Sequence, residues 1–385
     1  DDIRRYVAES GLPIELFRLE KNIGFAGAHN FLFTKHQSDY VQLLNDDSFL
    51  ESDYLEKVIG YLERHSECAA VSGRIYRWDF EGRDQPSGGR TTIVDSLGLE
   101  VGLTGSVKDI GAGQTYSDEL FIHAEATEVV GVSGCLPCYR VSAVRQVSPD
   151  GALFDGSFIS YKEDVDLAFR FRAAGYGAAV LHSAVAYHRR SFGVGVRRPS
   201  PPEVSYQSYR NHLWLHIAYT KFSDLFWKSC LVISYETAKC AYWLLKKPSH
   251  VIDAYRDTRS AWRKLIQKRY FVDALAQGRR SRGGEPPTPA STKKDVDIAL
   301  IMVSHNELNE ECLRSLAEAR KRTSLKVEVI VVDNASTKYR ANEFVGEFFD
   351  DAYVLLRNGD FGFGRSCNRG AKEVNADYYF FLNPD

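Results

Sequence analysis

Methionine is nearly absent from this chain of 385 residues, and proline is scarce, with 12 copies. An excess of charge is absent too. The net charge of −2 lacks the basic surplus that nucleic-acid-binding proteins carry, so we expect no nucleic-acid partner. With 44% hydrophobic residues, the composition excludes collagen-like, low-complexity and disordered classes. The length predicts a globular protein of about two or three domains.

The first residues contain no apolar stretch that could serve as a secretory signal peptide. The chain opens on Asp1 rather than on methionine, so we expect it to be a piece of a longer protein. Its seven cysteines are odd in number and scattered, which predicts reduced thiols in a cytoplasmic protein. Cys135 and Cys138 have zinc or redox spacing, but no second pair accompanies them, and we interpret them as structural.

A repeated segment is the most informative feature of the sequence. GFAGAHNFLFTKHQSDYVQLLNDD (24–47) and GFGRSCNRGAKEVNADYYFFLNPD (362–385) share eight of 24 residues at a constant offset of 338. So long an offset indicates a duplicated domain rather than a solenoid repeat. We therefore expect two modules, the first without its opening strands and the second ending in mid-domain.

The runs 296–304 and 327–333 are apolar and β-branched, and a helical pattern lies between them, which predicts parallel strands in a βαβ unit. This half-module could complete the sheet of the first module; we expect two separate, incomplete modules instead. The predicted regions are an α/β module over 1–202, a helical extension over 203–277, a linker rich in Gly, Pro, Ser and Thr over 278–295, and the N-terminal half of a second module over 296–385.

Acidic residues close an apolar strand in both copies of the repeat. Asn45, Asp46 and Asp47 end the first copy, and Asp385 ends the second. Carboxylates at such a place suit Mg²⁺ or Mn²⁺ bridging phosphates. Asp also favours turns and helix N-caps, so a purely structural role is the alternative. Recurrence at a fixed offset favours function.

Three carboxylates fall within four residues at Glu163, Asp164 and Asp166. Their mutual repulsion can raise a pKa and make one of them a general base. The alternative is a first helical turn whose acids complement the helix dipole. Asp166 and Arg170 stand i,i+4, which favours a structural ion pair. His188, where an apolar strand ends, is a candidate ligand for a metal or a phosphate.

Eight motifs in order resemble family 2 glycosyltransferases of the GT-A fold, in particular the rhamnosyltransferase-like branch. They comprise Val303-Ser304-His305-Asn306, Cys312-Leu313-Arg-Ser-Leu316, Val331-Val332-Asp333-Asn334-Ala-Ser336, Gly362-Phe363 with Asn368, Asn45-Asp46-Asp47, Gly134-Cys-Leu-Pro-Cys-Tyr-Arg140, Glu163-Asp164-Val-Asp166 and His188. The resemblance implies a Rossmann-like α/β fold, with a mostly parallel sheet and flanking helices. A helical segment and the first half of a second GT-A module would follow.

The resemblance also implies inverting transfer of a sugar, rhamnose-like, from dTDP-rhamnose or a UDP-sugar to a glycan or lipid-linked acceptor in cell-surface polysaccharide synthesis. Asp164, flanked by Glu163 and Asp166, would be the catalytic base, and Asp333 would hold the nucleotide. Metal ligands would be Asp47, His188 and Asp385. Donor contacts would come from Gly24, Phe25, Asn30, Asn45, Asp46, His305, Asn306, Asp333, Asn334, Gly362, Phe363 and Asn368.

Two other classes stay open, a non-catalytic scaffold that keeps this fold and a sugar nucleotidyltransferase. The latter would need a Gly-rich basic loop after the first strand, where SHNELNEE is acidic. Residues 225–245 predict an amphipathic helix that lies in a membrane interface or packs on the catalytic module. Basic residues at 263, 264, 268 and 269 would favour anionic lipid on the inner face of the plasma membrane.

Overall fold

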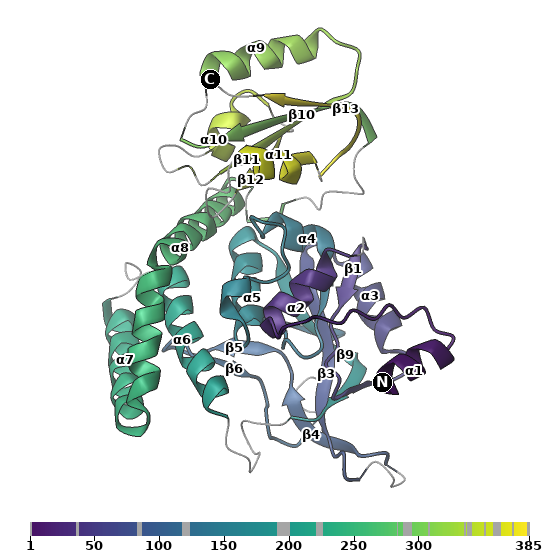
Figure 1. Cartoon of the computed structure of the whole chain (residues 1–385), viewed down its shortest axis with the longest axis vertical. Helices are drawn as coiled ribbons and strands as arrows, with labels where there is room; N and C mark the ends of the chain where they lie inside the picture. The colour runs from purple at the N-terminus through teal and green to yellow at the C-terminus, as the bar shows by residue number, and fades with distance from the viewer. Residues whose placement is uncertain are drawn as a thin grey trace.

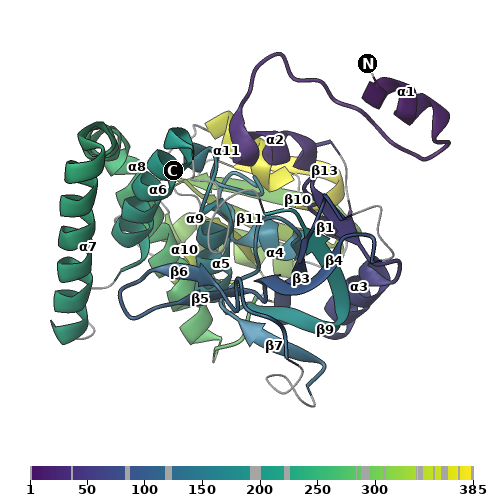
Figure 2. The same cartoon turned by 90° about the horizontal axis from the view of Figure 1, so that it is seen from below.

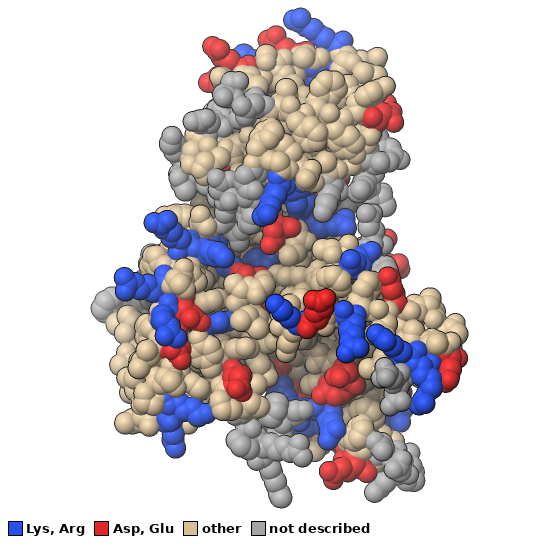
Figure 3. Space-filling view, viewed as in Figure 1, with Lys and Arg blue, Asp and Glu red and all other residues tan. Residues whose placement is uncertain are grey.

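The structure is a computed structural model of the whole chain. It describes residues 2–35, 38–82, 87–117, 124–190, 201–220, 226–282, 284–287, 295–306, 309–334, 336, 341–349, 352–356, 363–371 and 373–382. Two sheets form two lobes, and a helical segment lies beside the first (Figure 1). Basic and acidic side chains are interspersed over the face drawn in Figure 3.

The first lobe is built on a seven-stranded sheet. Its main order is β1-β8-β3-β9-β2, with β4 beside β3 and β7 beside β9. Only β3 and β9 pair in parallel among these strands, and the other described pairs are antiparallel. The bounds are β1 (Tyr40–Gln42), β2 (Ser48–Leu50), β3 (Cys68–Trp78), β4 (Arg90–Ser96), β7 (Ala126–Val129), β8 (Cys138–Arg140) and β9 (Gly177–His188).

Helices cover both faces of this sheet. Val58 and Leu62 of α3 pack on one face together with Val71 and Ile75 of β3. On the other face, α2, α4 and α5 close a second core around Phe171. The bounds are α1 (Asp2–Glu9), α2 (Gly24–Phe33), α3 (Tyr54–Arg64), α4 (Val141–Gln146), η2 (Gly156–Phe158) and α5 (Glu163–Ala174), with a small hairpin of β5 (Leu99–Val101) and β6 (Val107–Asp109) nearby.

The helical extension consists of α6 (Pro202–Tyr219), α7 (Phe226–Lys246) and α8 (Pro248–Ser281). Trp214 and Leu215 of α6 are buried against Phe158 and Leu265, so α6 and α8 join the core of the first lobe. Helix α7 lies on the outer side of α6 (Figure 2). None of the described helices is long and apolar enough to cross a membrane.

The second lobe is a four-stranded parallel sheet in the order β12-β11-β10-β13. The predicted parallel strands at 296–304 and 327–333 are confirmed as β10 and β11. The bounds are β10 (Asp295–Ser304), α9 (Glu310–Lys321), β11 (Val327–Asp333), α10 (Ala341–Gly346), β12 (Tyr353–Leu356), α11 (Phe363–Ala371) and β13 (Asn375–Leu382). The repeated segment folds alike twice, since α2 and β1 correspond to α11 and β13.

The second lobe does not extend the first sheet. Strand β10 already lies between β11 and β13, so no edge of β10 is open for β1. The two half-modules are therefore separate in the described strands, as expected. The prediction of a mostly parallel sheet needs a correction for the first lobe. Strands β3 and β4, which follow one another in the sequence, pair antiparallel, and β8 runs antiparallel to both β1 and β3.

Candidate functional site

Asp47 and His188 lie side by side where strands β2 and β9 pair. The register places Ser48 opposite His188, which brings the preceding turn to the histidine ring. The Nε2 atom of His188 is 3.2 Å from Asp47 Oδ1, and its Nδ1 atom is 2.8 Å from Oδ2 of Asp95 on β4. The structure thus brings together two of the predicted metal ligands, and it adds a buried carboxylate behind the histidine.

This arrangement fits a divalent cation. A ligating histidine usually bonds a carboxylate through its other ring nitrogen, as His188 bonds Asp95 here. One imidazole nitrogen and one carboxylate oxygen suit Mn²⁺ better than Mg²⁺, which prefers oxygen ligands. Burial lowers the pKa of His188, but its bonds with Asp47 and Asp95 outweigh burial and raise that pKa to about 9. Burial raises the pKa of Asp47, and the contact with His188 reverses this, so that pKa is lowered.

Cys135 lies beside this pair, with its Sγ within 4.8 Å of ligand atoms of Asp95 and His188. Burial raises the pKa of the Cys135 thiol, so a cation that bound this sulfur would have to displace its proton, as it would at His188. Burial also raises the pKa of Cys138 to about 12. None of the seven cysteines forms a disulfide.

Asp164 lies in the first turn of α5, and two backbone N–H groups donate to its carboxylate. Gly134 donates its N–H to Oδ2 at 2.9 Å, and Val165 donates to Oδ1 at 2.8 Å. Burial raises the pKa of Asp164, while these two bonds oppose the shift. Burial and the charge of Asp164 raise the pKa of the neighbouring Glu163 to about 8. At neutral pH, Glu163 is therefore the protonated member of the pair.

One short segment connects Asp164 to the strand-end pair. Gly134 donates to Asp164, and the carbonyl of the next residue, Cys135, accepts the N–H of Asn45 at 3.2 Å. Asn45 opens the turn that carries Asp47. The peptide groups of two adjacent residues, Gly134 and Cys135, thus contact the candidate base and the turn that carries Asp47.

Asp46, in the same turn, is exposed, whereas Asn45 is partly buried. The predicted donor contacts of these two side chains stay predictions, since the described contact of Asn45 is made by its backbone.

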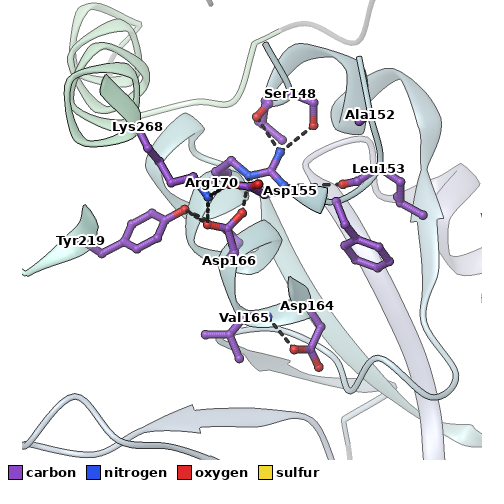
Figure 4. Close-up of polar contacts among 12 residues, drawn as sticks. Ser148, Ala152, Leu153, Asp155, Asp164, Val165, Asp166, Arg170, Tyr219 and Lys268 are labelled. Atoms are coloured by element: carbon purple, nitrogen blue, oxygen red, sulfur yellow. Dashed lines mark hydrogen bonds and ion pairs between the residues drawn. The ribbon is translucent and has the colours of Figure 1, made fainter. Parts of the chain in front are cut away.

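Asp166 belongs to an internal ion network and not to the reactive edge (Figure 4). It is fully buried, and its carboxylate meets Arg170 at 3.1 Å and Lys268 at 2.6 Å. Tyr219 donates to it at 2.7 Å, and Lys268 also pairs with Asp155. The predicted ion pair with Arg170 is confirmed. The expectation that Asp166 joins the catalytic carboxylates needs correction, because both of its oxygens are already bonded inside the protein.

The loop before α5 adopts strained conformations. Ile159, Tyr161 and Lys162 all have φ between 64° and 69°, which non-glycine residues rarely adopt. Asn211 of α6 donates to the carbonyls of Phe158, Ser160 and Tyr161 at 3.0, 2.9 and 2.7 Å. The adjacent Arg210 bonds Ser157 and Phe158, also through their carbonyls.

The sequence predicted no role for Arg210 and Asn211, and it predicted that Lys268 attracts lipid. Arg210 and Asn211 are two adjacent polar residues within a helical stretch rich in aromatic residues. That adjacency was the feature of the sequence that could have pointed to them. Buried polar residues on a helix must find partners, so such a pair predicts a contact with irregular backbone.

Three residues predicted to bind the donor also contact the segment before α5. Gly24 has φ +76°, and a Cβ there would lie 2.5 Å from Ile159. The backbone N–H of Phe25 donates to the Ser160 hydroxyl. The donor contacts of Gly24 and Phe25 stay predictions. Asn30 exchanges two 2.8 Å bonds with the backbone of Phe154, so both polar atoms of its amide are engaged inside the protein, and we correct the expectation for Asn30.

The second lobe gathers its predicted donor residues at the carboxyl ends of β10 and β11. His305 Nδ1 lies 2.7 Å from the carbonyl of Asn334, and Ser336 accepts the N–H of Asn306 at 2.8 Å. Ser336 in turn donates its N–H to Asp333, and burial raises the pKa of that carboxyl group. Phe363 and Asn368 are exposed on α11, while Gly362 and Asp385 lie outside the described residues.

The chain belongs to glycosyl transferase family 2, which it matches over residues 1–144 and 299–385, more than half of its length. The fold is GT-A. The matched residues lie in both lobes.

Two solved structures are similar. A crystal structure of GalNAc-T7 with UDP, GalNAc and Mn²⁺ has 9% identity and a TM-score of 0.45 over 74% of this chain and 46% of that one. A crystal structure of S. aureus TarS 1-349 has 14% identity and a TM-score of 0.36 over 73% of this chain and 78% of that one. The chain thus spans less than half the length of the GalNAc-T7 chain. No curated protein matched the sequence.

Proposed function

We propose that this glycosyltransferase is metal-dependent and inverting. It moves a sugar, rhamnose-like, from a nucleotide-diphosphate donor to a glycan or lipid-linked acceptor in cell-surface polysaccharide synthesis. The observation that carries the proposal is the link between Asp164 and the pair of Asp47 and His188 through Gly134 and Cys135. A base and a cation site held on one short segment suit a transfer in which one group takes a proton while charge develops on a leaving diphosphate.

Asp164 is the general base in this proposal. An acceptor hydroxyl is a weak nucleophile at neutral pH, and its proton passes to an oxygen of the Asp164 carboxylate as the new glycosidic bond forms. The N–H groups of Gly134 and Val165 fix the orientation of that carboxylate. Glu163, protonated beside it, adds no second negative charge at neutral pH. Asp166 keeps the start of α5 in place through Arg170 and Lys268.

Asp47 and His188 would hold Mn²⁺ or Mg²⁺. When bound, the cation neutralises charge on the diphosphate of the donor. Asp95 orients the His188 ring, and Arg190 in turn holds Asp95 at 2.6 Å.

A cavity of about 820 Å³ lies beside the loop that precedes the base, and we assign it to the acceptor. Its lining combines Tyr161, Tyr235 and Trp243 with Lys162 and Lys239. Aromatic rings pack on the apolar faces of sugars, and ammonium groups attract phosphate. This combination supports a glycan acceptor that carries phosphate, as a lipid-linked acceptor does.

In the second lobe, Asp333 would hold the nucleotide of a donor, with His305, Asn306 and Asn334 around it. Because β10 pairs with β13, we assign these four residues to the module of the second lobe.

The test is a donor screen. The protein, extended at both ends so that both modules are complete, is incubated with dTDP-rhamnose and a panel of UDP-sugars, with Mn²⁺, with Mg²⁺ or with excess chelator, and the released nucleoside diphosphate is measured. We expect one donor to be consumed when metal is present and none when the chelator is in excess. A phosphorylated glycan acceptor should make consumption of that donor faster. Donor binding without turnover under every condition would favour the scaffold alternative. Release of pyrophosphate from a nucleoside triphosphate and a sugar phosphate would favour the nucleotidyltransferase.

A further inference from the structure

A second cluster of metal-binding residue types lies on the helical extension, away from the strand-end pair. His212 and His216 stand i,i+4 on α6 and therefore share one face of that helix. Glu236 of α7 faces them. The Nε2 atoms of the two histidines are 3.1 Å apart, and Glu236 Oε1 lies 2.6 Å from His212 Nε2 and 3.5 Å from His216 Nε2.

Hydrogen bonding alone accounts poorly for this triangle. If both Nε2 atoms carry a proton toward Glu236, the two N–H groups face each other at 3.1 Å. If His216 donates to His212, the accepting nitrogen faces a carboxylate oxygen at 2.6 Å, and two lone pairs meet. No placement of protons turns all three contacts into ordinary two-centre hydrogen bonds.

A cation at the centre satisfies all three atoms. Zinc binds histidine nitrogen and carboxylate oxygen at about 2.0–2.2 Å in tetrahedral geometry, which sets neighbouring ligand atoms about 3.3 Å apart. The Nε2 atom of His216 lies 3.1 Å from His212 Nε2 and 3.5 Å from Glu236 Oε1, on either side of that value. The distance of 2.6 Å between His212 Nε2 and Glu236 Oε1 must increase by about 0.7 Å to admit the cation.

The surroundings resemble those of a ligand set. His216 bonds Thr220 through Nδ1 at 2.9 Å, which orients the ring from behind. Glu236 Oε2 is buried and has no hydrogen-bond partner among the described residues. Lys239, the nearby cation, lies 3.9 Å from Glu236 and over the rings of Tyr209 and Tyr235, so it does not fill the triangle.

Helix α7 buries little apolar surface. Val232 is the only buried hydrophobic residue among its described side chains, whereas Leu231, Ile233 and Leu245 are exposed. Near its end, Trp243 packs on Tyr209 of α6. A cation held by Glu236 would add a second contact with α6, about two turns before Trp243.

We propose that His212, His216 and Glu236 bind a zinc-class divalent cation that fastens α7 to α6. This site is separate from the strand-end pair and takes no part in the chemical step. Removing the cation would loosen α7, and with it one wall of the cavity that Tyr235 and Lys239 line.

The test is zinc binding by the full chain in an Asp47→Ala background, which weakens the other candidate site. After removal of metal by a chelator, zinc is titrated by calorimetry, and Co²⁺ is added separately to look for the intense visible absorption of a tetrahedral complex. We expect one zinc per chain. Glu236→Gln and His216→Ala should each lower its affinity more than about 100-fold, and Thr220→Val about 10–100-fold. His250→Ala, at a buried histidine of the same helical extension, is the matched control and should bind normally.

Circular dichroism checks the fold of each variant. X-ray absorption of the zinc-loaded parent protein, which needs no ligand variant, should show two imidazole ligands. Zinc binding that is unchanged in folded Glu236→Gln and His216→Ala variants would overturn the proposal, and so would a zinc spectrum without imidazole.

Discussion

Gly134 donates its backbone N–H to the carboxylate of Asp164 at 2.9 Å, although the two residues are 30 positions apart. The bond fixes the carboxylate of Asp164, in the first turn of α5, to the segment that also contacts the turn carrying Asp47. A carboxylate that accepts two amide N–H groups is oriented before any substrate arrives, which is the usual requirement for a general base.

Asp164→Asn should lower the transfer rate about 10²–10⁴-fold, because the amide keeps the shape of the side chain and removes the base. Donor affinity should change little, and both are read from steady-state kinetics. Glu163→Gln is the matched control. The pKa of Glu163 is raised to about 8, so glutamine imitates the form present at pH 7, and activity there should stay near that of the parent. The reverse pattern, with the loss in Glu163→Gln, would move the base to Glu163.

The buried Glu163 should make the stability of the protein depend on pH. Its pKa rises from an ordinary 4.5 to about 8 in the folded protein, so the folded state retains a proton that the unfolded state loses. Its contribution to stability is complete below pH 4.5 and disappears as the pH rises through about 8. Glu163→Gln removes this dependence. The difference between the Tm of Glu163→Gln and the Tm of the parent should therefore rise from pH 5 to pH 9. A difference that does not change with pH would contradict the raised pKa of Glu163.

Asp47→Ala should abolish metal-dependent transfer while leaving the fold intact, because Asp47 lies in a turn with its side chain one-third exposed. Glu56→Ala, at an exposed glutamate of α3, controls for the loss of a surface carboxylate. Transfer is measured across a Mn²⁺ titration, and folding by circular dichroism. Full activity of Asp47→Ala, or of the parent protein in excess chelator, would disprove the role of Asp47.

Asn211→Asp should impair transfer through the loop that precedes the base. The substitution keeps the size of the side chain but replaces an amide that donates to three carbonyls with a carboxylate that repels them. We expect a loss of about 1–3 kcal/mol in stability and a fall in kcat larger than the rise in KM for donor. Glu203→Gln, at an exposed position of the same helix, should change neither. An Asn211→Asp variant that is less stable yet fully active would show that the loop does not set the position of Asp164.

The repeat and its motifs predicted much of this arrangement, since α2 with β1 and α11 with β13 are the two copies of one segment. The resemblance also brought Asp47 and His188 into one site, which the pairing of β2 with β9 produces. The contacts of Asn211 and Lys268 could not be predicted, because each partner lies far away along the chain. Lys268, for example, bonds Asp166 across 102 residues. Asn30 shows the opposite error, since its motif suggested a ligand and its amide binds the loop backbone.

The orientation of α7 leads to a prediction about membranes. Its charged residues Glu236 and Lys239 face α6, so its apolar residues point outward, with Leu245 88% exposed and Ile233 55% exposed. An amphipathic helix that turns its polar side inward offers its apolar side to a lipid interface.

Lys246 and Lys247 follow Leu245 in the chain, whereas Lys268 is buried with Asp166 and Arg269 donates to the Thr220 carbonyl. The basic residues that attract anionic lipid are therefore expected at the end of α7 rather than in the middle of α8.

Leu245→Glu should reduce binding to vesicles containing anionic lipid about tenfold or more, because it replaces a large apolar side chain at the interface with a charge. Binding is measured by co-sedimentation at low and high salt, and higher salt should weaken it in the parent protein. Leu325→Glu, at an exposed leucine of the second lobe, is the matched control and should bind like the parent. Point variants serve better here than deletion of 222–277, since that deletion would remove Lys268 from the network around Asp166. Equal sedimentation of the parent and Leu245→Glu would mean that the outward face of α7 does not bind lipid.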